Sequence, residues 1–368
     1  MDVHIFAGSH IATHNTVEDH VLVHRVCCSG PQDFQLNVVD VFEKEHRIQP
    51  FQLVESAEIH ANALQIKQRF PSLPLLVRLH ASNFLVESFK KEYIPFRNKL
   101  RFLLGALRRG KWDLGYWRKY NLNQDADYHF VQMADFVSAP TRQMKNWVVS
   151  NWKMAPALIS VIENPFMENE AFKKARTHNE EQAVIFYGRL NVLKGLITAT
   201  MAMKIVLKKN PGWIWIIVGD DGTAADGKKS MKQWMQQELK AVSPQVMFYA
   251  SLPYGQLPAM LQQASIALVP SLFESYSYVT IEAMSAGKAV IGSSGTGIAS
   301  LIENNVSGKL ADPYSVKEWI ADIQGLIDDP ALRKQFGIAA IEKVEEKRAI
   351  NKEIIEYYRS FVIKTATH

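Results

Sequence analysis

The sequence predicts an α/β protein made of two doubly wound domains, and two observations support that prediction. The chain has 368 residues, which suits two domains of ordinary size. Short apolar runs of strand length alternate with longer stretches of helical period, most regularly after residue 180. This alternation is typical of parallel sheets that are covered by helices on both faces.

The second half of the chain shows the alternation most clearly. Strands are predicted at residues 184–186, 213–218, 246–249, 266–269 and 289–292. Helices are predicted in the stretch that ends at Lys208 and at residues 228–242, 257–264, 279–286 and 316–328. Ligands of such sheets bind beyond the carboxyl ends of the strands, so the residues that follow each strand are candidates for a site.

The first half is less regular. Strands are predicted at residues 3–6, 21–27, 35–41, 52–55, 75–80, 136–139 and 158–162, and helices at residues 57–70 and 141–152. Glu163-Asn164-Pro165-Phe166 punctuates the pattern and a polar stretch follows it. We therefore expect one domain at residues 1–163 and a second at residues 164–345.

Composition places the chain among globular proteins. Hydrophobic residues make up 47% and charged residues 21%. There is no apolar run of about 18 residues, and no basic segment precedes an apolar stretch at the start, so neither a transmembrane helix nor a signal peptide is expected. The two cysteines, Cys27 and Cys28, are adjacent, which favours reduced thiols and a cytoplasmic location.

The basic residues are concentrated in one segment. Residues 89–120 contain ten Lys or Arg and two acidic residues, a local net charge of +8 that leaves −3 for the rest of a chain of net charge +5. Arg97, Arg101 and Arg108 share one face of a predicted helix, with Phe102, Leu103 and Leu107 elsewhere. We expect an anionic membrane surface as a partner of this segment, at the inner face of the membrane. An ordinary solvated helix is the alternative, and no nucleic-acid-binding module is present.

Two glutamates stand in a predicted strand–loop–helix unit at residues 270–287. A strand ends at Pro270, and a polar loop with Glu274 leads into a helix near Tyr278. The free N–H groups of such a helix start bind anions. Glu282 lies about one turn into the helix, and a carboxylate accepts hydrogen bonds from a sugar diol. The unit therefore indicates a nucleotide-sugar site.

A second anion site is indicated by Gly188-Arg189-Leu190-Asn191-Val192-Leu193-Lys194-Gly195. Arg189 follows a predicted strand directly, and Lys194 stands where the next helix begins. Two cations beside a helix start suit a diphosphate leaving group, on which negative charge builds up as a glycosidic bond breaks.

These motifs resemble the retaining glycosyltransferases of family 4, whose fold is GT-B: two Rossmann-like domains that face each other across a cleft. The resemblance covers residues 183–345 most closely. It rests on three signatures in the family's order: Glu-x7-Glu at Glu274 and Glu282, Gly-Arg-Leu…Lys-Gly at residues 188–195, and Glu-Ala-Met-x-x-Gly-x-x-Val at residues 282–290. It also implies a last helix, in residues 346–368 near 351–363, that packs back on the N-terminal domain.

The resemblance implies roles for individual residues. Arg189 and Lys194 correspond to residues that hold the donor diphosphate, Glu274 to one that contacts the donor sugar, and Glu282 to one that contacts the ribose. Ser275, Tyr276 and Ser277 stand where the family usually has Gly-Phe-Gly, and they should still offer backbone N–H groups to phosphate. The loop of Ala250, Ser251, Leu252 and Pro253 corresponds to one that contacts the nucleobase, largely through its backbone.

In the first half, His80 ends a predicted strand where many family members carry a histidine that faces the donor sugar. Glu55 and Glu58 follow another predicted strand, and we interpret them as a solvated helix start. His4, His10, His14, His20 and His24 are interpreted as surface residues, so no metal site is predicted. Residues 1–7 match the second strand of the family pattern, and the sequence shows no counterpart of the family's first strand, glycine loop and helix. A rearranged N-terminal sheet or a start site placed too late would account for that difference.

We therefore expect a retaining glycosyltransferase that moves a hexosyl unit from a nucleoside diphosphate sugar to the hydroxyl of a sugar or lipid-linked acceptor. The resemblance implies a role in cell-surface polysaccharide or glycolipid synthesis, with no cofactor and no metal. Two alternatives stay open: a non-catalytic nucleotide-sugar-binding subunit, and a GT-B-type epimerase of nucleotide sugars.

Overall fold

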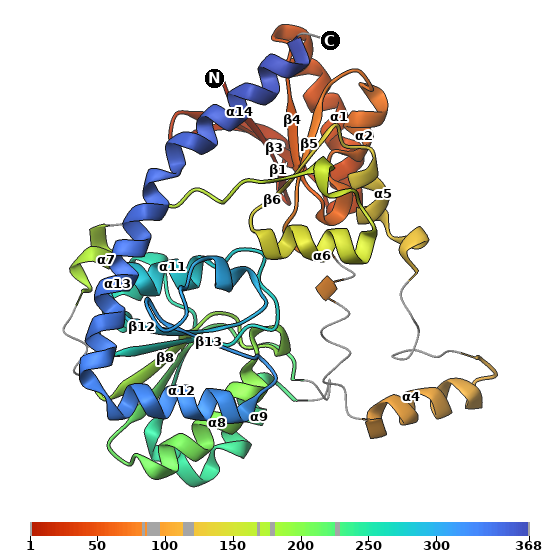
Figure 1. The fold of residues 1–368 in the computed structure, drawn as a ribbon. Helices are drawn as coiled ribbons and strands as arrows, with labels where there is room; N and C mark the ends of the chain where they lie inside the picture. The colour runs from red at the N-terminus through yellow and green to blue at the C-terminus, as the bar shows by residue number, and fades with distance from the viewer. Residues whose placement is uncertain are drawn as a thin grey trace.

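The structure, a computed structural model, describes residues 2–82, 85–86, 96–112, 121–167, 170–176, 181–224 and 229–366. Strands of the described residues form three sheets, two in the N-terminal half and one in the C-terminal half. Figure 1 shows the two halves one above the other, with the last helices running along one side of both.

The C-terminal half is built on one parallel six-stranded sheet. Its strands are β8 (Ala183–Tyr187), β9 (Ile214–Val218), β10 (Val246–Tyr249), β11 (Ile266–Val269), β12 (Ala289–Ser293) and β13 (Lys309–Ala311). They lie in the order β10-β9-β8-β11-β12-β13, so the direction of strand addition reverses between β8 and β11. In a doubly wound sheet such a reversal opens a crevice at the carboxyl ends of the two central strands, and ligands bind there.

Helices cover both faces of this sheet because its strand residues alternate between two apolar cores. One core includes Val184 and Phe186, and α8 (Leu196–Lys209), α9 (Met231–Glu238) and α12 (Val316–Asp328) pack on it. The other includes Ile185 and Tyr187, and α7 (Glu170–Lys174), α10 (Leu257–Gln262), α11 (Tyr278–Ser285) and α13 (Pro330–Ala349) pack on it. The expected doubly wound, α/β organisation is therefore present here.

The N-terminal half contains a parallel four-stranded sheet and a small three-stranded one. The first has the order β4 (Val54–Ala57), β5 (Leu75–Arg78), β6 (Phe136–Ala139) and β7 (Ile159–Val161). The second has β3 (Val21–Cys27) between β1 (His4–Ser9), which is parallel to it, and β2 (His14–Glu18), which is antiparallel. Four helices of this half, α1 (Pro31–Ile48), α2 (Leu64–Arg69), α5 (Ala126–Gln132) and α6 (Arg142–Trp152), pack into one core with β5 and β6.

The last helix, α14 (Asn351–Ala366), lies against the N-terminal sheet. Its Ile354 and Phe361 are buried with Leu76 and Ile162, and the Phe361 ring contacts the Phe136 ring at 4.5 Å between centroids. On the same face the Arg78 guanidinium donates hydrogen bonds to Glu55, Asn164 and the Tyr358 hydroxyl at 2.8–3.1 Å. The C-terminal helix is thus tied to β4 and β5 and to the chain segment that links the two halves (Figure 1).

Several predictions for the first half were wrong. Residues 35–41, predicted as a strand, lie inside helix α1, where Pro31 occupies the first turn and the buried Val38 and Phe42 are one turn apart. The helix predicted at residues 57–70 is reduced to a 3-10 turn, Ile59–Ala61, and the short α2. The positive φ angles of His60 (64°) and Ala61 (46°) interrupt it. Strands β2 and β13 and helix α13 were not predicted.

Helix α4 (Phe96–Arg108) belongs to the basic segment predicted at residues 89–120. Figure 1 shows it standing apart from both sheets. Residues 89–95 and 113–120 lie outside the described residues. In the part of the chain that the structure describes, no helix has the length and apolar character needed to cross a membrane.

Candidate functional site

The loops after β8 and β11 approach each other closely at the reversal point of the six-stranded sheet. The Leu272 N–H donates to the Leu193 carbonyl at 2.8 Å. Gly195 has a φ of +66°, and a Cβ atom there would lie 1.7 Å from the carbonyl oxygen of Pro270. Only glycine fits this position without displacing the backbone of the β11 loop. The contact therefore fixes the two predicted anion-binding loops against one another.

Lys194 and Glu274 meet in this crevice. The Lys194 ammonium donates to Glu274 Oε1 at 2.5 Å, and the Ser271 hydroxyl donates to the same oxygen at 2.8 Å. Asn191 caps the 3-10 turn Val192–Lys194 by accepting from the Lys194 N–H. The lysine predicted for diphosphate and the glutamate predicted for the sugar are thus neighbours. Ser271, which is buried, was not predicted as a site residue, although its position directly after Pro270 placed it in the motif.

The same two loops also carry unpaired donors. The exposed Arg189 guanidinium has no hydrogen-bond or ion-pair partner among the residues that the structure describes. Within the same residues, the backbone N–H groups of Ser275, Tyr276 and Ser277 also have no acceptor. Ser277 caps helix α11, and its hydroxyl accepts from the Thr280 N–H. A helix start with free N–H groups beside two cations is a site for a negatively charged ligand.

Glu282 lies deeper, on the inner side of α11, and is 8% exposed. Burial raises the pKa of its carboxyl to about 7, although the neighbouring Tyr254 and Tyr187 hydroxyls favour the carboxylate. The Tyr187 hydroxyl itself donates to the Val279 carbonyl at 2.6 Å. Burial beside Glu282 also raises the pKa of Tyr254 to about 12. Tyr254 directly follows Ala250–Pro253, where Ala250, Ser251 and Pro253 are exposed. The predicted ribose residue and the predicted base loop are therefore joined through a tyrosine that the sequence analysis missed.

His80 follows β5 in the N-terminal half and is partly exposed. Its Nδ1 donates to the Arg78 carbonyl at 2.9 Å, and its backbone N–H donates to both carboxylate oxygens of Glu58 at 2.8 Å. The neighbouring Glu58 raises the pKa of the imidazole, while burial opposes that shift. Glu58 is completely buried, so its interpretation as part of a solvated helix start was wrong. Glu55, 38% exposed in its side chain, pairs with Arg78.

The two halves contact each other at the carboxyl ends of β5 and β6. His80 and Thr141 follow the adjacent strands β5 and β6, and the Leu79 N–H donates to the Ser138 carbonyl at 2.8 Å. The Thr141 hydroxyl, which also caps α6, donates to the Ser275 carbonyl at 2.9 Å. Because His80 lies on the same edge of the N-terminal sheet as Thr141, it belongs to the edge that contacts the β11 loop.

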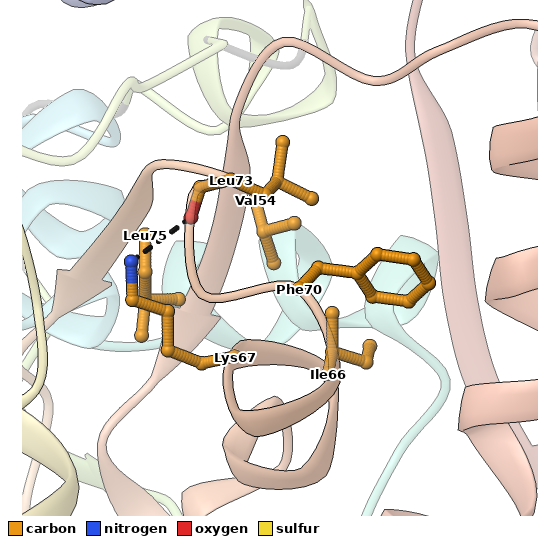
Figure 2. A pocket seen from close by; sticks show the side chains of 6 residues that line it. All are labelled: Val54, Ile66, Lys67, Phe70, Leu73 and Leu75. Carbon is orange, nitrogen blue, oxygen red and sulfur yellow. Dashed lines mark hydrogen bonds between the residues drawn. The ribbon is translucent and has the colours of Figure 1, made fainter.

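Two other features lie apart from the predicted site residues. A small pocket between α2, β4 and β5 is lined by Val54, Ile66, Lys67, Phe70, Leu73 and Leu75, and Lys67 donates across it to the Leu73 carbonyl (Figure 2). His24 is fully buried, which corrects its interpretation as a surface residue, and one ring nitrogen lies 3.0 Å from His4 while the other contacts Asn15. Side-chain ligand atoms of His4, His24 and Glu45 lie within 4.8 Å of one another.

Comparison with known proteins finds a family match for the C-terminal half. The profile of the family "Glycosyl transferases group 1" matches residues 167–343. The D-inositol 3-phosphate glycosyltransferase of Segniliparus rotundus is 30% identical over 161 residues, which are 44% of this chain and 35% of that protein. Two relatives of the same description, from Corynebacterium diphtheriae and Corynebacterium aurimucosum, match over 58% and 55% of their lengths. The chain therefore spans about a third to three fifths of these curated relatives.

Solved structures match over more of the chain. A sucrose-phosphate synthase from Thermosynechococcus elongatus superposes with a TM-score of 0.71 at 18% identity, over 100% of this chain and 90% of that one. Anabaena HepE in complex with UDP-glucose superposes with a TM-score of 0.65 at 18% identity, over 93% and 86% of the two chains. At these identities the likeness shows the fold. The chain has the GT-B fold, and its residues 167–343 match the profile of the family of glycosyl transferases group 1.

Proposed function

We propose that the chain is a retaining family 4 glycosyltransferase that moves a hexosyl unit from a nucleoside diphosphate sugar to an acceptor hydroxyl. The observation that supports this most is the contact between Lys194 and Glu274 at the reversal point, on the two loops that also carry Arg189 and the free N–H groups of residues 275–277. Cations and oriented N–H groups stabilise the charge that develops on a departing diphosphate. These donors take the charge without a metal or cofactor, and none is part of the proposal.

The donor's remaining parts match the side chains around the crevice. In this proposal the ionised Glu282 accepts from the ribose hydroxyls, and the backbone of residues 250–253 contacts the base. Glu274 exchanges its contact with Lys194 for the sugar hydroxyls when the diphosphate draws the lysine away. His80 faces the donor sugar from the N-terminal half. No side chain is assigned as a covalent nucleophile, since Glu274 holds the sugar rather than attacking it.

A uridine donor is the first to test, because HepE was solved with UDP and with UDP-glucose. The acceptor proposed is a sugar or a lipid-linked sugar in cell-surface polysaccharide or glycolipid synthesis, at the cytoplasmic face of the membrane. Helix α4 supports the membrane part of this proposal. Its apolar side chains recur at helical spacing and are exposed: Phe96 by 71%, Leu100 by 40%, Leu104 by 50% and Leu107 by 43%. Exposed Arg101 and Arg108 flank that stripe, and an apolar stripe beside cations binds anionic lipid surfaces.

The membrane proposal is tested by sedimentation with vesicles. The protein should bind vesicles that contain phosphatidylserine and bind neutral vesicles weakly or not at all. Leu100→Glu with Leu104→Glu should release it, whereas Leu36→Glu, which changes an exposed leucine on α1 (62% exposed), should not. Equal absence of binding to both vesicle types would overturn the membrane role and leave the transfer reaction untouched.

The transfer reaction is tested with a panel of UDP-, GDP- and ADP-sugars. We expect one donor to raise the melting temperature and to release its nucleoside diphosphate slowly to water and faster with a sugar acceptor. Donor binding without release would favour the non-catalytic subunit, and isomerised donor without acceptor would favour the epimerase. The anomeric configuration of the product, read by NMR, decides whether the reaction retains configuration.

A further inference from the structure

Glu58 is a completely buried carboxylate that accepts hydrogen bonds from His80. It stands directly after β4, and both of its carboxylate oxygens accept the backbone N–H of His80 at 2.8 Å. Its own N–H donates to the Arg78 carbonyl at 3.4 Å. Among the described residues, His80 supplies every hydrogen bond that the carboxylate accepts. Burying a carboxylate without a charged partner costs folding free energy, so packing alone does not explain why a glutamate occupies this position.

The imidazole of His80 is held by the same two residues. Nδ1 lies 2.9 Å from the Arg78 carbonyl, which can only accept, so the proton of the neutral ring is on Nδ1. Glu58 Oε2 lies 3.6 Å from the same nitrogen. Nε2 therefore carries the lone pair of the neutral ring and is the nitrogen left for a ligand. The charge of Arg78 also acts on the imidazole and lowers its pKa, while the Arg78 guanidinium donates to Glu55 and to the Tyr358 hydroxyl on the α14 side.

The geometry points to Glu58 as the positioning residue of His80: it fixes the strand end through the His80 N–H and places its carboxylate beside Nδ1, so that Nε2 is presented to the sugar. This inference rests on the proposed function, in which His80 faces the donor sugar. A carboxylate behind Nδ1 also stabilises the imidazolium, as a hydrogen-bonded partner does for histidines in other sites. The role is indirect, since Glu58 is buried and has no surface with which to touch a substrate.

Glu58→Gln tests this inference, because it keeps the shape and removes the charge. Histidine titration by NMR, with the His80 signal assigned from a His80→Gln variant, should show a lower pKa for His80 in Glu58→Gln than in the wild type. Donor hydrolysis should lose on the order of 10- to 100-fold in kcat with little change in the KM of the donor, as for a misaligned reacting group. Glu43→Gln is the matched control, a helix α1 carboxylate that pairs with Arg47 and Arg69.

The NMR titration needs no turnover, so it separates the two claims. An unchanged His80 pKa in folded Glu58→Gln would overturn the positioning role whatever the enzyme does. A lowered pKa with unchanged kcat would overturn its link to transfer. If Glu58→Gln does not fold, Glu58→Asp replaces it as the test variant. The shortened carboxylate of Glu58→Asp should lower kcat, while the pKa of His80 stays nearer the wild-type value. A wild-type kcat in Glu58→Asp would contradict the inference. Absence of transfer in the wild type, with the pKa shift intact, would count against the proposed function alone.

Discussion

The carboxyl ends of the two parallel sheets present opposite chemistry. The C-terminal sheet ends in donors: Arg189, Lys194 and the free N–H groups of residues 275–277. The N-terminal sheet ends in a histidine that rests on a buried carboxylate. The donors of the C-terminal sheet suit tight binding of an anion, and the histidine of the N-terminal sheet suits the orientation of one reacting partner. Under the proposed function, this difference would place donor affinity in the C-terminal half and turnover at the contact between both halves.

The most damaging change to the C-terminal half is expected at Gly195. In Gly195→Ala the new Cβ would lie 1.7 Å from the Pro270 carbonyl oxygen, at a φ of +66°. We expect the free energy of unfolding to fall by roughly 2–5 kcal/mol. Nucleotide binding should also be lost, because the loops after β8 and β11 can no longer meet. Urea denaturation measures the fall in stability. Gly325→Ala, in open space on α12, is the control and should be neutral or stabilising.

Glu274→Gln should leave the fold intact and remove most of the transfer. The amide cannot match the carboxylate in holding sugar hydroxyls or in pairing with Lys194. We expect kcat for donor hydrolysis to fall on the order of 10²- to 10³-fold, the range seen when one preorganised group is removed from an active site. Full activity in this variant, measured by release of the nucleoside diphosphate, would refute the role given to Glu274.

A smaller effect on stability and on UDP binding is expected from the titration of Glu282, in the C-terminal half. Its folded-state pKa is raised from 4.5 to about 7, so its contribution to stability is present below pH 4.5 and is lost as the pH rises through 7. The unliganded protein should lose on the order of 3 kcal/mol over this window from Glu282. UDP should bind roughly tenfold more tightly at pH 8 than at pH 6, since the ribose needs an ionised acceptor. The stability trend should vanish in Glu282→Gln, and the pH dependence of UDP binding that remains in this variant is that of the nucleotide itself.

The sequence predicted the C-terminal half far better than the N-terminal half, for physical reasons. Strands buried on both faces read as apolar runs between glycines, so β8 to β12 and the loops after them were found. Residues 35–41 contain apolar side chains that fit a strand as well as a helix. The segment is helical because Val38 and Phe42, one turn apart on α1, pack into the core. The burial of Glu58 depends on the turn at His60 and Ala61 and on the strand end at His80, contacts that no local pattern reveals.

UDP titration by calorimetry tests the division between the halves most directly. We predict that Arg189→Ala with Lys194→Ala weakens UDP binding on the order of 10²-fold or more, because each of the two lost charged contacts is worth about 1.5–3 kcal/mol. His80→Ala should bind UDP as the wild type does while losing donor turnover, and Lys209→Ala, at the far end of α8, should change neither. Wild-type affinity in the Arg189 and Lys194 double variant, or lost affinity in His80→Ala, would contradict the account.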